Sequence, residues 1–186
     1  MAITGVCFAG FGGQGVILAG MIAGRAACLY DGKFATLTQS FGPEARGSAC
    51  SAHLVVSPEP IIYPYLKHPN ILVAMSQEAY RLFRPTLMPG GVLLYEEELV
   101  ALHETADDAS RFGIPATRFA EELGRRLVLN VVMVGFTVAV TGITTPEAAR
   151  QAIRDSVPPG TESVNLAAFE KGLAHGRSKP CLPRAA

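Results

Sequence analysis

The chain has 186 residues, of which 49% are hydrophobic and 17% charged, a composition typical of one globular domain with a full core. Its formal net charge is zero, so the sequence gives no electrostatic reason to expect binding to nucleic acid or to an anionic membrane. No apolar run is as long as a transmembrane helix and the N-terminus lacks the charged start of a signal peptide, so we expect a cytoplasmic protein.

The cysteines Cys7, Cys28, Cys50 and Cys181 are widely spaced and form no CxxC pair. Iron–sulfur and zinc sites usually need closely spaced cysteines, so we expect this chain to make neither site alone. Buried structural thiols are the more common outcome for cysteines in apolar runs.

The N-terminal residues predict a strand, a glycine-rich turn and a helix. Residues 3–9 are apolar, as in a central strand buried on both faces. The turn Gly10-Phe11-Gly12-Gly13-Gln14-Gly15 follows, and helical spacing of small and aliphatic residues predicts a helix over residues 16–30. Because N–H groups and partial positive charge gather at such a helix start, the turn is a candidate anion site with Gln14 as a polar handle. A tight turn that packs against a neighbouring chain is the alternative.

Strands and helices alternate along the middle of the chain. Apolar or alternating β-branched runs predict strands at residues 34–40, 48–57, 70–75, 92–95 and 113–116. Helices are predicted at residues 77–84 and 117–126, the second with Glu121 and Arg125 as an i,i+4 ion pair.

Three features of this middle region are ambiguous. His53 is a candidate ligand or base, although a lone histidine in a strand is more often one that is hydrogen-bonded or partly exposed. Pro64 limits residues 61–65 to an edge element. The run Glu96-Glu97-Glu98 predicts a solvated loop, since consecutive side chains do not converge on one point.

The last third is more apolar. Residues 127–141 predict a helix buried on most faces, with a strand as the alternative because of the many valines. This segment needs more cover than a small chain supplies, which hints at a partner. Helices are predicted at residues 147–157, after Pro146, and at residues 165–175.

The order of elements predicts an α/β fold with a mainly parallel, Rossmann-like sheet flanked by helices. We expect one domain over residues 1–176 and a disordered tail over residues 177–186.

The glycine turn fits G-x-G-x-x-G as Gly10, Gly12 and Gly15. A dinucleotide site also needs an acidic residue about 20 positions further on, at the end of the second strand. Residues 38–40 are Thr, Gln and Ser, and the nearest carboxylate, Asp31, precedes that strand. The sequence therefore disfavours NAD, although a free-standing nucleotide-dependent oxidoreductase stays as an alternative.

A second group, Gly42-Pro43-Glu44-Ala45-Arg46-Gly47, follows the second strand. Arg46 suits a phosphate or carboxylate held by paired hydrogen bonds, with Glu44 orienting it, and an intrachain ion pair is the alternative. The predicted cofactor-binding residues are Gly10, Gly12, Gly13, Gln14, Gly15, Ser40, Gly42, Glu44 and Arg46. No nucleophile with a base and an orienting group is visible, so we predict no catalytic residue and favour a supporting subunit.

Together these two groups carry a family resemblance. Residues 10–16 (GFGGQGV) with residues 39–47 (QSFGPEARG) closely resemble the gamma subunit of 2-oxoacid:ferredoxin oxidoreductases. The resemblance continues through residues 130–135 and 165–169, so it covers nearly the whole chain. Ser48 stands where the family usually has a second glycine.

This resemblance implies a complex that decarboxylates a 2-oxoacid on thiamine diphosphate with Mg²⁺. The acyl group leaves on coenzyme A, and electrons pass through 4Fe–4S clusters to ferredoxin. The cofactors are expected in the alpha and beta subunits and in a ferredoxin-like delta subunit, so this chain is expected to bind none of them itself. By hypothesis, its two loops help to position coenzyme A.

Chain length and motif resemble the 2-oxoglutarate or branched-chain oxoacid branch more than the pyruvate branch. The isolated chain is expected to dimerise through surfaces that its partners would cover. A purely structural interaction module, whose glycine turn binds nothing, is the remaining alternative.

Overall fold

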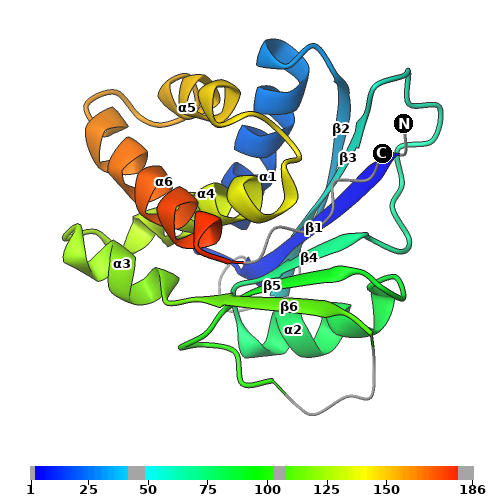
Figure 1. Ribbon diagram of the computed structural model, residues 1–186, viewed down its shortest axis with the longest axis horizontal. Coiled ribbons are helices and arrows are strands. Elements are labelled where there is room, and N and C mark those ends of the chain that lie inside the picture. The colour runs from blue at the N-terminus through cyan, green and yellow to red at the C-terminus, as the bar shows by residue number, and fades with distance from the viewer. Residues whose placement is uncertain (1–2, 42–48, 103–107, 180–186) are drawn as a thin grey trace.

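The structure is a computed structural model that describes residues 3–41, 49–102 and 108–179. Within these residues, helices pack on both faces of one six-stranded sheet (Figure 1). The strands are β1 (Thr4–Phe11), β2 (Phe34–Ser40), β3 (Ala49–Ser57), β4 (Ile71–Ala74), β5 (Val92–Glu96) and β6 (Ser110–Ile114). The α-helices are α1 (Val16–Arg25), α2 (Gln77–Phe83), α3 (Ala116–Glu122), α4 (Leu129–Thr141), α5 (Pro146–Arg154) and α6 (Glu162–Arg177). A π-helical segment (Ala26–Tyr30) extends α1, and 3-10 turns lie at Arg84–Thr86 and Arg126–Val128.

The strand order is β2-β3-β1-β4-β5-β6. The pairs β1–β4, β4–β5 and β5–β6 are parallel, whereas β3 runs antiparallel to both β1 and β2. Only residues 41–48 join β2 to β3, and a parallel crossover needs about a dozen residues or more, so these strands must pair antiparallel. The α/β fold with a mainly parallel sheet is confirmed.

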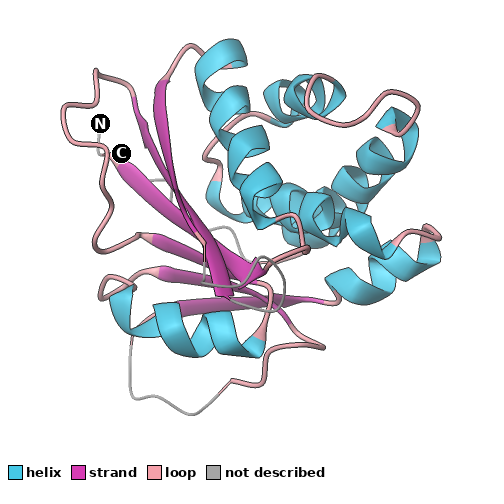
Figure 2. Cartoon of the chain, turned by 180° about the vertical axis from the view of Figure 1, so that it is seen from behind, coloured by secondary structure: helices cyan, strands magenta, loops and turns pink. Residues whose placement is uncertain are grey.

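Helices cover both faces of the sheet (Figure 2), and each face has its own hydrophobic core. Successive strand residues point to opposite faces, so Val6 and Phe8 of β1 join the large core under α1, α3, α4, α5 and α6. Cys7 and Ala9 join the smaller core under α2. No helix in the described part of the chain is long and apolar enough to cross a membrane.

Helix α4 is the centre of the large core. It is a helix, as predicted, and the chain itself covers it, since α1, α3, α5 and α6 all pack on it. The expectation that it needs a partner for cover is therefore wrong. Gly135 of α4 and Gly172 of α6 allow the two helix backbones to touch, because a Cβ on either glycine would lie about 2 Å from a carbonyl oxygen of the other helix.

Three local predictions differ from the structure or are refined by it: the end of the domain, the edge element at residues 61–65 and the partner of Glu121. Helix α6 continues through Arg177, so that residue belongs to the domain, and residues 180–186 lie outside the described residues. Residues 61–65 form no strand. Glu121 pairs with Arg126 (Oε1 to Nη2, 2.6 Å) instead of Arg125, because α3 ends at Glu122 and the i,i+4 geometry is lost.

The predicted solvated loop at residues 96–98 is wrong for Glu96, whereas Glu97 and Glu98 are exposed as expected. The side chain of Glu96 is fully buried, and its carboxylate accepts hydrogen bonds from the N–H groups of Leu99 (2.6 Å) and Thr117 (3.1 Å). Burial raises the pKa of Glu96, and the backbone donors partly offset this rise. This carboxylate joins the end of β5 to the start of α3, so its role in the described structure is to hold these elements together.

Candidate functional site

The glycine turn joins β1 to α1 at the carboxyl edge of the parallel strands. Gly13 and Gly15 have φ values of 100° and 72°, which strongly favour glycine. The N–H of Ala19 donates to the carbonyl of Gly15 at 2.9 Å, so the chain enters α1 directly from the turn. Gly15 occupies the N-cap position and offers no capping side chain, so the first amides of α1 are left for water or a ligand.

Gln14 serves the turn itself. Its Oε1 accepts from the N–H of Phe11 at 2.7 Å, and its Nε2 donates to the carbonyl of Met75 at 3.0 Å. Gly10 leaves room for this, since a Cβ there would lie 2.5 Å from Gln14 Oε1. The amide therefore ties the turn to the end of β4, in contrast to the polar handle for a ligand that the sequence suggested.

Asn130 holds the turn from the opposite side. It lies buried at the start of α4, and its Nδ2 donates to the carbonyl of Gly15 at 3.1 Å. A Cβ on Gly15 would lie 2.4 Å from this Nδ2. Glycine is therefore required at this position both by its φ value and by the amide of Asn130.

Gly13 is the part of the turn that faces open space, since a Cβ there would meet no atom within 4 Å. Two cavities of about 280 and 240 Å³ meet at Gly13, and Leu127, whose side chain is 72% exposed, lines both. Arg126 lines the larger cavity and is paired with Glu121. Arg125 lines the smaller one, is exposed, and makes no ion pair within the part of the chain that the structure describes.

These groups define the candidate site as the surface around Gly13, Arg125 and Leu127. Among the described residues, the helix amides have no side-chain cap and the Arg125 guanidinium has no ion pair, which favours an anion, and the exposed leucine favours an apolar group beside it. Sequence reasoning missed Arg125, Leu127 and the structural role of Asn130. The only signal for them was an arginine pair directly before the apolar helix.

The second predicted group is only partly visible. Gly42, Glu44 and Arg46 lie outside the described residues. Ser40 is exposed at the end of β2, opposite Ser51 of β3, which is in turn opposite Ala9 near the end of β1. Ser40 therefore lies at the same sheet edge as the glycine turn, about two strand spacings or roughly 10 Å away.

The geometry does not support a dinucleotide at this turn. In a dinucleotide-binding sheet, the neighbouring parallel strand ends in an acidic residue near the turn. Here β1 lies between antiparallel β3, with Cys50 opposite Gly10, and parallel β4, which is followed by Met75 and Ser76 and not by an acidic residue. Asp31 is used elsewhere, because its carboxylate accepts from Thr144 Oγ1 (2.5 Å) and from the N–H of Thr145 (2.8 Å) before α5.

Cys7, Ser51 and His53 form a polar cluster on the α2 side of the sheet. His53 Nε2 lies 3.0 Å from Ser51 Oγ and 3.9 Å from Cys7 Sγ, and the imidazole makes an edge contact with Phe83. Burial raises the pKa of Cys7 to about 12, so its thiol is not the reactive thiolate. Burial also lowers the pKa of His53, which favours the neutral form of its ring. This cluster is a packed polar contact, as the sequence favoured for His53.

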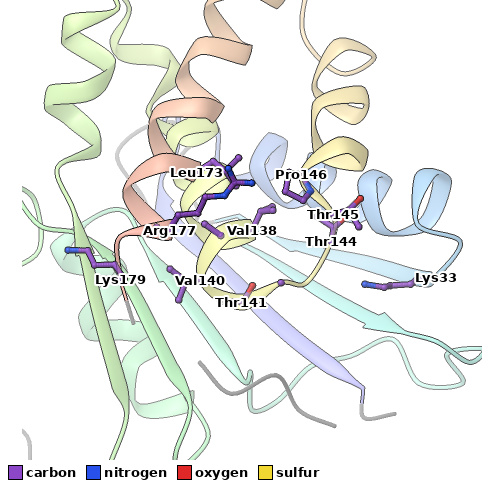
Figure 3. A pocket seen from close by; sticks show the side chains of 13 residues that line it. Lys33, Val138, Val140, Thr141, Thr144, Thr145, Pro146, Leu173, Arg177 and Lys179 are labelled. Atoms are coloured by element: carbon purple, nitrogen blue, oxygen red, sulfur yellow. The ribbon is translucent and has the colours of Figure 1, made fainter. Parts of the chain in front are cut away.

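A further cavity of about 460 Å³ lies between the ends of α4 and α6 (Figure 3). Lys33 lies at one end of it and Lys179 at the other, with Arg177 between them. Lys33 Nζ donates to the carbonyl of Ile143 at 2.7 Å. Helices α4 and α6 end here, and their negative dipole ends disfavour an anion while the cations stabilise them. The N-terminus of α5 also lines the cavity, but it is already capped by the Thr145 side chain and bonded by the Asp31 carboxylate. We therefore place the candidate site at the glycine turn.

The comparisons with known proteins agree on one family. A family model for pyruvate ferredoxin/flavodoxin oxidoreductase matches residues 5–175. The chain is 49% identical over 170 residues to "2-oxoglutarate synthase subunit KorC" of Methanothermobacter marburgensis, which covers 88% of this chain and 91% of that protein. It is 50% identical over 165 residues to the protein of the same name from Methanocaldococcus jannaschii, which covers 88% of each.

Two solved structures similar to this chain are also named as 2-oxoacid:ferredoxin oxidoreductases or subunits of them. The gamma subunit of a keto/oxoacid ferredoxin oxidoreductase from Geobacter sulfurreducens has a TM-score of 0.84 and 35% identity, covering 95% of this chain and 99% of that one. The 2-oxoglutarate:ferredoxin oxidoreductase of Magnetococcus marinus, solved with 2-oxoglutarate, coenzyme A and succinyl-CoA bound, has a TM-score of 0.87 at 21% identity. The match spans all of this chain and 33% of that one, and at this identity it is a likeness of fold.

Proposed function

The chain belongs to the pyruvate ferredoxin/flavodoxin oxidoreductase family, and on that basis we propose that it is the gamma subunit of a 2-oxoglutarate synthase. In this role it joins other subunits that oxidatively decarboxylate 2-oxoglutarate, transfer the succinyl group to coenzyme A and reduce ferredoxin. The observation that carries the proposal is about 50% identity to two 2-oxoglutarate synthase subunits over most of both chains.

The described residues do not fit a metal centre or an iron–sulfur cluster. Residues 3–41, 49–102 and 108–179 contain no cluster of three or more His, Cys, Asp or Glu side chains that could hold a metal ion. Cys7 and Cys50 are buried and Cys28 is exposed, each as a free thiol. Following the family resemblance, we assign thiamine diphosphate with Mg²⁺ and the 4Fe–4S clusters to the alpha, beta and delta subunits, and we assign no catalytic step to this chain.

The surface around Gly13, Arg125 and Leu127 supports a role beyond assembly, namely positioning coenzyme A. The first amides of α1 and the Arg125 guanidinium supply donors for a phosphate, and Leu127 supplies an apolar surface for the uncharged part of the cofactor. Arg46, which lies outside the described residues, is proposed as a second phosphate donor.

The first experiment is an anaerobic purification of the complex through a C-terminal tag on this chain. We expect partner subunits, thiamine diphosphate and iron in the eluate, with coenzyme A-dependent oxidation of 2-oxoglutarate faster than that of pyruvate or branched-chain oxoacids. Purification of the chain alone, without cofactors, would overturn the subunit proposal.

The coenzyme A role is tested separately. Arg125→Ala and Arg46→Ala are each expected to raise the KM for coenzyme A about tenfold in an intact complex, the loss of roughly one charge-assisted hydrogen bond. Arg81→Ala, an exposed arginine on α2, is the matched control and should leave this KM unchanged. If both variants keep the wild-type KM and assemble normally, coenzyme A is not held here. If they lower assembly alone, the turn is a docking surface.

A further inference from the structure

The two edges of the sheet differ in how well they are protected. β2 forms one edge, and within the described residues it pairs only with β3 (Figure 1). Its seven residues, Phe34–Ser40 (FATLTQS), include no charge and no proline. β6 forms the other edge, has five residues and carries Arg111. Proteins usually protect edge strands with charges, prolines or short length, so β2 is the open edge.

An apolar groove runs beside this open edge. It is a cavity of about 240 Å³ between α1, the π-helical segment and β2, with a mostly apolar lining that includes Met21, Cys28, Leu29, Ala35 and Leu37. Arg25 also lines it, and the Arg25 Nη1 donates to the carbonyl of Asp155 at 3.5 Å. Within this lining, Leu29 is 59% exposed. The neighbouring cation Lys33 is turned away, with its Nζ bonded to the carbonyl of Ile143 at 2.7 Å.

We propose that β2 and this groove form the interface with a second copy of this chain. In this dimer β2 pairs antiparallel with its own mate, so that the two sheets become continuous and the two grooves close against each other. This inference rests on the strand and the groove and is independent of the proposed function.

The strand is suited to pair with itself. With Leu37 opposite Leu37 of the mate, Thr36 lies opposite Thr38, Ala35 opposite Gln39, and Phe34 opposite Ser40. Within the strand no like charges meet, because Phe34–Ser40 carries no charge, and paired threonines are favourable neighbours across strands. About half of the strand's backbone groups point outward and gain hydrogen bonds. The formal net charge of zero means that two copies do not repel each other.

In this antiparallel arrangement, side chains of β2 also stabilise the proposed dimer. Residues directly opposite in an antiparallel pair project to the same face, so both Leu37 side chains lie on the α1 side together. There they meet Leu29 and Met21 of the two grooves. A second copy therefore satisfies the backbone edge and the apolar groove at once, without requiring a partner of different chemistry.

The test uses the full chain in sedimentation equilibrium over a range of micromolar concentrations. The wild-type chain should show reversible association to twice its mass of 19.7 kDa. Leu29→Lys should weaken the dimer at least about tenfold, because it places a charge in the closed groove. Leu82→Lys is the matched control: Leu82 is 57% exposed on α2, on the other face, and this variant should dimerise as the wild type does.

Hydrogen exchange then distinguishes strand pairing from other contacts. Amides of Phe34–Ser40 should become protected as the concentration rises, and those of β6 should not change. A chain that stays monomeric, a dimer whose protection lies elsewhere, or equal weakening by both lysine variants would each overturn the proposal. So would protection of β2 that arises only when the other subunits of the complex are added.

Discussion

The crossing of α4 and α6 yields the strongest prediction about stability. Replacing Gly135 by alanine would place a Cβ 2.1 Å from the carbonyl oxygen of Phe169 and 3.0 Å from the nitrogen of Leu173. Both are backbone atoms, so no side chain can rotate away. Since the closest comfortable carbon–oxygen approach is about 3.3 Å, the helices must separate by roughly 1 Å along their contact.

The size of the effect follows from two opposing terms. Separating well-packed helices costs on the order of 3–5 kcal/mol, at or above the upper end for overpacked cores, because the whole contact opens and not one side chain. Alanine is about 1 kcal/mol better than glycine inside a helix. We therefore expect Gly135→Ala to lower the free energy of unfolding by about 2–4 kcal/mol, or roughly 1–2 M in the urea midpoint.

Gly24→Ala in α1 is the matched control. A Cβ there would meet only Leu54 Cδ1, at 3.0 Å, which is the movable end of a side chain. This variant should be neutral or up to about 1 kcal/mol more stable than the wild type, from helix propensity alone. If Gly135→Ala unfolds at a urea midpoint close to those of the wild type and Gly24→Ala, the two helix backbones are not in contact and the described packing is wrong.

Three further predictions concern polar contacts. Asn130→Ala removes the donor to the Gly15 carbonyl and should cost about 1–2 kcal/mol by calorimetry, whereas an unchanged midpoint would show that the glycine turn holds its shape unaided. Asp31→Asn loses hydrogen bonds to a carboxylate and should lower the free energy of unfolding by about 1–3 kcal/mol near neutral pH. Burial opposes ionisation, but the hydrogen bonds from Thr144 and Thr145 hold the pKa of Asp31 below its usual value. The stabilisation by Asp31 is therefore present above the unfolded pKa and is lost as pH falls through the folded pKa, so the variant should lose less stability at acid pH than the wild type. Burial lowers the pKa of His53 below 6.5, so on acidification the unfolded chain binds the proton first and the free energy of unfolding should fall below about pH 6.5. His53→Gln should make the free energy of unfolding, measured by urea titration, depend less steeply on pH. An equal dependence in the variant and the wild type would mean that His53 is solvated.

Local sequence was sufficient for the elements and for the turn. Strand, glycines and helix follow one another within residues 3–30, and their spacing depends only on neighbouring residues, so the β1–turn–α1 unit was predictable. The same holds for α4: a 13-residue apolar segment without charge forms a helix, because a helix satisfies its own backbone hydrogen bonds when it is surrounded by other helices. The eight-residue gap between β2 and β3 already excluded a parallel crossover.

What the tertiary structure decided is everything that depends on contacts between distant residues. The order β2-β3-β1 puts an antiparallel strand beside the glycine turn, and no local pattern specifies which strands become neighbours. From the sequence alone Gln14 is predicted to be free for a ligand, but in the fold its amide bonds the Met75 carbonyl at the end of β4. Of three consecutive glutamates only Glu96 is fully buried, because the start of α3 closes over it. Arg125 and Leu127 reach the turn only because α4 packs against α1, so the described part of the candidate site forms only in the folded chain.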